Sequence, residues 1–322
     1  MNAKNILLLL TISLIFLLNF SCSNNKEKDL LVNQGKDLYK QGKYEEALTN
    51  FDKALKITPE DIYILYYKGE SLKHLGKYQE AINAYDEALR IDGKIKSIWY
   101  SKGLACIETA NYAGALESFD KVIELDPNAV YILRYKGEIL YHQGKYDEAI
   151  KCYDKLLSSE PKNTLVLNNK GLALAGLGKQ KEAIACYDMV LKIDQKNVEA
   201  WNYRGAAFIL LANYGEAITC FDRAIKLDPK NVYAWNYRGF ALTLGRNYKE
   251  SIKSFDMVLK LDPNNIEAWN YKGFSLYLLK DYKEAIPCFD KALELDPDYE
   301  DARNNRLVAL MAISEEKVKS KK

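Results

Sequence analysis

The residues best able to do chemistry in this chain are its cysteines and its two histidines. Thiolates and imidazoles are the usual ligands of zinc, and paired thiols form disulfides. His74 and His142 have no Cys, Asp or Glu recurring beside them at the spacing of metal ligands. Four of the cysteines, however, are separated by multiples of 34 residues: Cys152, Cys186, Cys220 and Cys288. That spacing has to be explained before any of them is assigned to a site.

The spacing belongs to the whole chain. The string Gly-Lys-Tyr-x-Glu-Ala begins at Gly42, Gly76 and Gly144, and looser forms of it occur between and beyond. A fixed period of this length is typical of a stacked repeat architecture. Without any gap, the chain divides into eight 34-residue repeats, 28–61, 62–95, 96–129, 130–163, 164–197, 198–231, 232–265 and 266–299. Each residue in them is assigned a repeat position from 1 to 34.

Three repeat positions are nearly invariant in residue size. Position 8 is always glycine, position 20 is Ala or Ser, and position 24 is always Phe or Tyr. Glycine inside a helix costs about 1 kcal/mol, so its recurrence indicates close packing between two helices. Position 32 is mostly proline, which ends a helix. At position 16, Asn111, Asn213, Asn247 and Asp281 are predicted to cap second helices.

These positions resemble the tetratricopeptide repeat pattern, and the resemblance covers residues 28–299. It implies an all-α fold, an αα superhelix of eight helix–turn–helix repeats. In that family the first helix of each repeat, positions 1–14, lines a concave groove, and the second helix lies outside it. Residues 300–322 are expected to form a capping helix and a charged tail, because terminal repeats need a polar face.

The repeat register changes the interpretation of the cysteines, because all four occupy position 23. Equivalent atoms of adjacent repeats are expected about 10 Å apart, the scale of helix packing. A disulfide needs Cα atoms within about 7 Å. Packing as buried thiols is therefore favoured over the two alternatives, a metal site or a disulfide.

The N-terminal residues 1–21 are predicted to be a signal peptide. Lys4 precedes an apolar run, 6–20, which as a helix reaches about 22 Å, short of the ~30 Å needed to span a membrane. The segment before Cys22 resembles the lipidation motif of bacterial lipoproteins, although Asn19 stands where an aliphatic residue is usual. The resemblance implies a lipid on Cys22, a linker at 22–27, and a location on the exported side of the cell membrane or outer membrane. The alternative is a plain signal with an incidental cysteine.

The predicted groove carries a row of asparagines at position 5: Asn168, Asn202, Asn236 and Asn270. An Asn amide has both donors and an acceptor, so such a row can pair with a peptide backbone without reading its side chains. Four aromatic residues on the same predicted face suit apolar side chains of a ligand: Tyr233, Phe240, Phe274 and Tyr277. The alternative is that recent duplication of one repeat copied the asparagines without a function.

Nothing in the remaining sequence predicts catalysis. We find no phosphate-binding loop, nucleophile motif or metal motif, so no enzyme activity, cofactor or metal is expected. The net charge of +2 gives no electrostatic argument for a nucleic acid partner. The sequence therefore predicts a non-enzymatic scaffold that binds a protein or an extended peptide and meets the membrane through its N-terminal lipid. An envelope glycan-binding module is the alternative.

Overall fold

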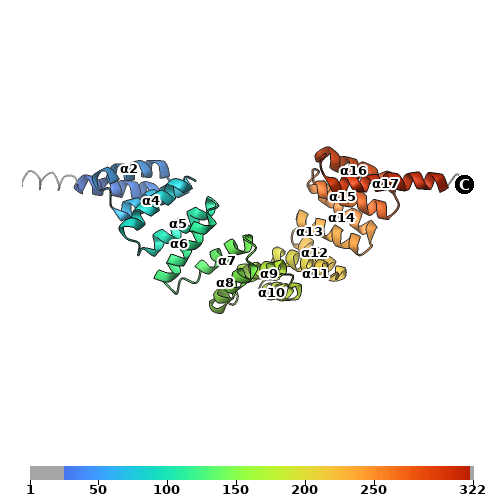
Figure 1. Cartoon of the computed structure of the whole chain (residues 1–322), viewed down its shortest axis with the longest axis horizontal. Coiled ribbons are helices and arrows are strands. Elements are labelled where there is room, and N and C mark those ends of the chain that lie inside the picture. Colours follow the sequence, from blue (N-terminus) through green and yellow to red (C-terminus); the bar gives the residue numbers. More distant parts are fainter. Residues whose placement is uncertain (1–24, 320–322) are drawn as a thin grey trace, which may run out of the picture. The chain divides into compact units, whose positions relative to one another are not determined.

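The computed structural model describes residues 25–319, which form helices joined by short turns and contain no strand (Figure 1). The helices are residues 25–40, α2 (Tyr44–Ile57), α3 (Ile62–His74), α4 (Tyr78–Ile91), α5 (Lys96–Glu108), α6 (Tyr112–Leu125), α7 (Ile132–His142), α8 (Tyr146–Ser159), α9 (Thr164–Gly176), α10 (Gln180–Ile193), α11 (Val198–Leu210), α12 (Tyr214–Leu227), α13 (Val232–Leu244), α14 (Tyr248–Leu261), α15 (Ile266–Leu278), α16 (Tyr282–Leu295) and α17 (Glu300–Lys319). This confirms the predicted all-α solenoid of helix–turn–helix repeats.

The helices alternate between two roles. Odd-numbered helices up to α15 are the first helices of their repeats, and even-numbered helices are the second helices. Most of them pack against the next helix in the chain, as α11 does against α12 and α12 against α13. The chain divides within α7 into two compact units, one ending at Ile139 and the other beginning at Leu140, and each is described by itself.

The packing predicted for positions 8 and 24 is confirmed. Phe221 is completely buried, and its ring lies against the backbone of Gly205 in the same repeat. A Cβ atom added at Gly205 would lie 2.7 Å from Cζ of Phe221. The same close approach is made by Gly35, Gly69, Gly103, Gly171, Gly239 and Gly273 to their own position-24 rings. Glycine is thus required at position 8 by the thickness of an aromatic ring.

The turn between the two helices of a repeat uses left-handed backbone at position 15. Gly178 takes this conformation with φ of 75°, as do the glycines of three other repeats. Ala212, Arg246 and Lys280 are held at φ of 55°, 62° and 65° in the same turn. A side chain in this region costs about 1–2 kcal/mol, so these repeats carry local strain that the glycine repeats avoid.

Side-chain caps fix where helices begin. Asn111, Asn213 and Asp281 accept hydrogen bonds from backbone N–H groups at the starts of α6, α12 and α16, as predicted. Asn247 makes no such bond at α14, so that prediction was wrong. A second set of caps was not predicted: position 34 begins the first helices α9, α11, α13 and α15 with Asn163, Asn197, Asn231 and Asn265.

The last helix, α17, closes the second unit by packing against α15 and α16. Ala302 and Ala309 are fully buried in this contact. The face of α17 that turns away is partly apolar, since Leu307 and Met311 are 57% and 56% exposed. The capping helix is therefore less polar on its outer face than expected for the end of a repeat array.

Candidate binding surface on the first helices

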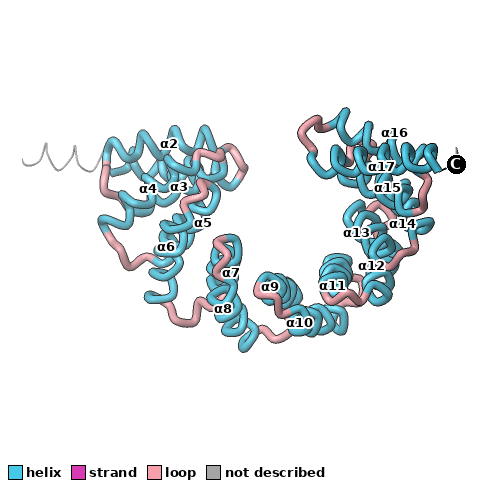
Figure 2. Tube along the Cα trace, turned by 45° about the vertical axis from the view of Figure 1, so that its right-hand side comes forward, coloured by secondary structure: helices cyan, strands magenta, loops and turns pink. Residues whose placement is uncertain are grey.

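The first helices of the second unit form a continuous surface. α9 contacts α11, α11 contacts α13, and α13 contacts α15. Among the described second helices of this unit, by contrast, the backbone of one does not approach that of the next within 8 Å. The first helices are therefore drawn together on one side of the unit while the second helices spread apart on the other, as Figure 2 shows for α9–α16.

The structure places the predicted asparagine row at the junctions between repeats. Asn168, Asn202 and Asn270 are only 3%, 6% and 2% exposed, and Asn236 is half-buried. The row is thus not an open line of amides. Position 5 turns toward the following repeat, and binding of a ligand by these residues stays a prediction.

The buried amides contact the caps of the next first helices. The Nδ2 groups of Asn168 and Asn202 each donate, over 3.5 Å, to Oδ1 of Asn197 and Asn231. Those oxygens also accept the backbone N–H that begins α11 and α13, at 2.8 and 2.9 Å. These two members of the row therefore link α9 to the start of α11 and α11 to the start of α13.

The carbonyl ends of the same amides have no matching partners. Within the described chain, the Oδ1 atoms of Asn168, Asn202 and Asn236 are buried and accept no hydrogen bond. An unsatisfied buried acceptor costs about 1–3 kcal/mol. At the last junction the cost is avoided, because Oδ1 of Asn270 accepts from Nδ2 of Asn305 at 2.9 Å.

The four predicted aromatic residues lie on two neighbouring first helices, α13 and α15. Tyr233 is 38% exposed, and Phe240, Phe274 and Tyr277 are half-buried. Tyr233 lies against Tyr237 with ring centroids 4.2 Å apart. We call Tyr233, Phe240, Phe274 and Tyr277 the aromatic patch. It offers accessible, rigidly held apolar surface on packed helices.

The first unit carries a charged group on its first helices that is already paired. Glu70 on α3 is 8% exposed and accepts from the hydroxyl of Tyr85 at 2.6 Å and from Nζ of Lys73 at 2.9 Å. Burial alone would raise the pKa of Glu70, but hydrogen bonds from Ser101 and Tyr85, together with Lys73, outweigh it and lower the pKa. The Glu70 carboxylate thus stabilises the unit and is little available to a ligand.

A second set of residues joins the repeats and was not recognised from the sequence. Position 25 is Asp in every repeat, and its carboxylate pairs with the Lys or Arg at position 7 of the next repeat. The pairs are Asp52–Lys68, Asp86–Lys102, Asp120–Lys136, Asp154–Lys170, Asp188–Arg204, Asp222–Arg238, Asp256–Lys272 and Asp290–Arg306. The invariant Asp and the conserved positive charge were visible in the repeat register. They tie each second helix to the following first helix.

Most of the thiols pack in the interior. Of the four cysteines at position 23, Cys186, Cys220 and Cys288 are buried, as the packing interpretation predicted, whereas Cys152 is half-buried. Burial raises the pKa of the three buried thiols. None of the five cysteines that the structure describes forms a disulfide with another of them. His74 stacks on Tyr44 with ring centroids 4.4 Å apart. The described residues hold no group of three His, Cys, Asp or Glu side chains placed to bind a metal ion.

The tryptophans at position 4 are also structural. Each indole Nε1 donates to the backbone carbonyl six residues earlier, as Trp201 does to Gln195 at 3.0 Å. Trp99, Trp235 and Trp269 make the same bond to Gly93, Pro229 and Pro263. This bond holds the indole against the turn that precedes its helix.

Repeated helix–turn–helix units, a glycine against an aromatic ring in each, and a surface of first helices define an αα repeat scaffold. Comparison with known families agrees. Residues 92–261, more than half of the chain, match the N-terminal tetratricopeptide repeat region of Psidin. Residues 32–94 and 266–299 match tetratricopeptide repeat models, and 248–279 match the protein prenyltransferase alpha subunit repeat. The chain belongs to the tetratricopeptide repeat family.

Three solved structures share this fold at low sequence identity. The C-terminal part of a tetratricopeptide repeat protein from Cytophaga hutchinsonii is 17% identical, with a TM-score of 0.57 over 85% of this chain and 98% of that one. The APC/C hetero-tetramer Cut9–Hcn1 is 19% identical, with a TM-score of 0.56 over 88% of this chain and 55% of that one. Yeast Tom70 is 19% identical, with a TM-score of 0.52 over 86% of this chain and 60% of that one. No curated protein matches the chain. The shared fold is consistent with protein–protein interaction.

The predicted signal peptide at 1–21 and the lipidation site Cys22 lie outside the described residues. Among the residues that are described, no helix is long and apolar enough to cross a membrane.

Proposed function

We propose that this chain is a non-enzymatic scaffold that holds an extended segment of a partner protein across α13 and α15. The aromatic patch is the observation that carries the proposal. Accessible aromatic side chains on a rigid helical face are the residues that most often dominate protein interfaces, because they bury much apolar area at little cost in conformational entropy. The patch spans two repeats, which suits an extended segment.

The asparagine row has a supporting part in this proposal. Asn236 is the most accessible of the four asparagines, and it lies on α13 with Tyr233 and Phe240 of the patch. Its Oδ1 is buried and accepts no hydrogen bond within the described chain, and we propose that the amide turns to accept a backbone N–H of the bound segment. Asn168, Asn202 and Asn270 then act mainly by fixing the stacking of the repeats that carry the patch.

We further propose that the scaffold is exported and tethered by a lipid on Cys22, at the cell membrane or outer membrane. The apolar run that precedes Cys22 supports this, together with the resemblance of that segment to bacterial lipoproteins. Cell fractionation of the wild type and of Cys22→Ala tests the tether. Loss of detergent partitioning and of globomycin-sensitive processing in the variant is expected. Unchanged partitioning would remove the tether from the proposal.

The groove is tested by crosslinking followed by affinity capture from cell envelopes. The variant Tyr233→Ser/Phe274→Ser removes apolar surface from both helices of the patch. Its matched control, Met189→Ser/Ile193→Ser, removes exposed apolar side chains from α10, since these two are 45% and 43% exposed. We expect the patch variant to lose its partner by about tenfold or more and the control to retain it.

Recovery of the same partners by the patch variant would refute binding at the aromatic patch. A separate variant, Asn202→Ala/Asn236→Ala/Asn270→Ala, tests the asparagine row. Its thermal unfolding is measured beside its binding, because two of these side chains are buried. Lost stability with retained partner capture would assign the row to repeat stacking alone.

A further inference from the structure

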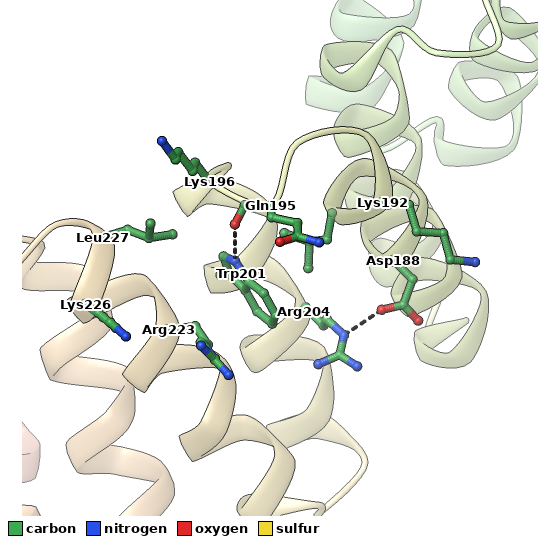
Figure 3. A pocket seen from close by; sticks show the side chains of 10 residues that line it. Asp188, Lys192, Gln195, Lys196, Trp201, Arg204, Arg223, Lys226 and Leu227 are labelled. Atoms are coloured by element: carbon green, nitrogen blue, oxygen red, sulfur yellow. Dashed lines mark hydrogen bonds and ion pairs between the residues drawn. The ribbon is translucent and has the colours of Figure 1, made fainter.

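A pocket of about 670 Å³ lies in the second unit, and none of the aromatic patch residues lines it. It is open between the second helices α10 and α12 and is floored by the first helix α11. Its lining residues are Asp188, Leu191, Lys192, Gln195, Lys196, Trp201, Arg204, Arg223, Lys226 and Leu227. We call it the Trp201 pocket (Figure 3).

The pocket exists because the second helices spread apart. α10 and α12 both pack on α11, yet they make no contact with one another. Trp201 stands in the opening between them, with its ring fixed by the hydrogen bond to Gln195. Leu191 and Leu227 provide further apolar wall. The centre of the pocket is therefore apolar and preformed.

The rim of the pocket is strongly basic. Five basic side chains line it against one acidic side chain, Asp188. Arg204 is fully engaged: its Nε donates to Asp188 at 2.7 Å, and one NH group lies 3.0 Å from Sγ of Cys220. Among the described residues, the other four make no ion pair: Lys192, Lys196, Arg223 and Lys226.

These four charged residues line the pocket from three different elements. Arg223 and Lys226 lie about one turn apart on α12 and line the same pocket as Trp201 (Figure 3). Lys196 lies above the indole on the loop before α11, and Lys192 lies beyond Asp188 on α10 with its amino group turned outward. An anion near the indole would therefore face positive charge on at least two sides.

The repeat architecture supplies an internal comparison. A pocket of about 490 Å³ lies over α15 at the corresponding junction, with Trp269 at the place of Trp201. Its two basic residues, Lys272 and Lys291, are balanced by Asp256 and Glu284. Lys272 pairs with Asp256 at 2.7 Å. The opening thus recurs at a second junction, where the positive charge is balanced by acidic residues instead of being left unpaired.

We propose that the Trp201 pocket binds an acidic segment of a partner protein, with an apolar or aromatic side chain against Trp201 and flanking carboxylates on Arg223 and Lys226. Guanidinium groups pair with carboxylates in a bidentate geometry, and ammonium groups add unoriented charge. The apolar centre and the volume suit amino-acid side chains better than a bare inorganic anion. This contact is separate from the aromatic patch and does not depend on it.

The proposal is tested by fluorescence anisotropy with a fluorescein-labelled peptide, Glu-Glu-Phe-Glu-Glu-Asp, and its uncharged counterpart, Gln-Gln-Phe-Gln-Gln-Asn. The variant Arg223→Gln/Lys226→Gln removes two of the unpaired charges. Its control, Lys155→Gln/Lys291→Gln, removes two charges at the repeat position equivalent to Arg223 in other repeats. We expect the pocket variant to weaken binding of the acidic peptide about tenfold, and the control to weaken it by less than about threefold.

Two further measurements separate this site from general attraction. Trp201→Leu places at this position the residue that Leu167 provides in the preceding repeat, so the fold is retained while the aromatic surface is lost. Trp201→Leu should weaken binding of the acidic peptide, whereas Tyr233→Ser/Phe274→Ser should leave that binding unchanged. Raising NaCl from about 0.05 M to about 0.5 M should abolish the difference between wild type and the pocket variant.

The proposal would be overturned if the pocket variant and the control lost binding of the acidic peptide equally. It would also be overturned if the uncharged peptide bound wild type as tightly as the acidic peptide. Vesicles containing phosphatidylglycerol serve as the competing probe. If they bind wild type through Arg223 and Lys226 while the acidic peptide does not bind, the pocket takes a lipid headgroup and the proposal is wrong.

Discussion

Replacing Gly205 by alanine should destabilise the second unit, although alanine is the better helix former. Gly205 lies within α11, where the change to alanine would by itself stabilise the helix by up to about 1 kcal/mol. The added Cβ, however, would lie 2.7 Å from Cζ of Phe221, whereas carbon atoms in contact are separated by about 3.5–4.0 Å. The Phe221 ring must therefore move by about 1 Å.

The ring has no free space to move into. Phe221 is 0% exposed and packs among Ala217, Ala224 and Ala234 in one apolar cluster. Forcing extra volume into a close-packed core typically costs about 1–3 kcal/mol. After the gain in helix propensity, we expect Gly205→Ala to lower the free energy of unfolding by about 1–2 kcal/mol.

The assay is urea denaturation followed by far-ultraviolet circular dichroism, with Gly215→Ala as the matched control. Gly215 lies in α12 of the same repeat, is exposed, and has nothing within 4 Å of its added Cβ. It should be neutral or stabilising by about 0.5 kcal/mol. Adding Phe221→Leu to Gly205→Ala should recover part of the loss, because the smaller side chain relieves the clash.

If Gly205→Ala is as stable as Gly215→Ala, the predicted clash between the added Cβ and the Phe221 ring is refuted. This result would mean that position 8 tolerates a methyl group and that its eight glycines do not serve the approach of the ring.

Three other perturbations test the remaining contacts. Asp222→Asn removes the carboxylate that pairs with Arg238 at 2.6 Å on a partly exposed surface. The variant should lower the free energy of unfolding by less than about 1 kcal/mol, and by less still at high salt. A larger loss that salt does not reduce would contradict a surface ion pair. Burial raises the pKa of Cys288 to about 11. The buried thiols should therefore react slowly with Ellman's reagent at neutral pH in the folded protein, and quickly after unfolding in guanidinium. Rapid reaction of every thiol in the folded state would exclude this burial. The pKa of Glu70 is lowered in the folded state, so the stabilising effect of its carboxylate is present above the ordinary glutamate pKa and is lost as pH falls through the lowered value. On acidification, the free energy of unfolding should therefore fall less in Glu70→Gln than in wild type. Identical pH profiles would show that Glu70 is not stabilised as a carboxylate.

Most of the local architecture could be predicted from the sequence. The repeat period fixed which residues share a position, and the contact of Gly205 with Phe221 follows from glycine and aromatic residues recurring at a constant distance. Caps such as Asn213 were predictable because an Asn side chain bonds to backbone only a few residues away. Asn247 has the same local sequence setting, yet its side chain does not cap α14.

The candidate sites were less predictable. Helical periodicity placed Asn202 and Tyr233 on one face, but the structure buries Asn202 and leaves Tyr233 accessible. The difference depends on how far each helix is rotated toward its neighbour. That rotation is set by contacts between repeats, such as the amide of Asn202 on the cap residue Asn231. Contacts of this kind have no counterpart within a single repeat.

The sequence by itself determined the fold class, the repeat register and the packing role of the thiols, because these depend on periodicity and on side-chain size. Only the tertiary structure decided which polar residues remain accessible and where charge is left unpaired. The Asp188–Arg204 pair neutralises one cation of the Trp201 pocket, while Arg223 and Lys226 line the pocket without an acidic partner among the described residues. Charge pairing across neighbouring repeats is a matter of distance in space, and the spreading of α10 from α12 set that distance.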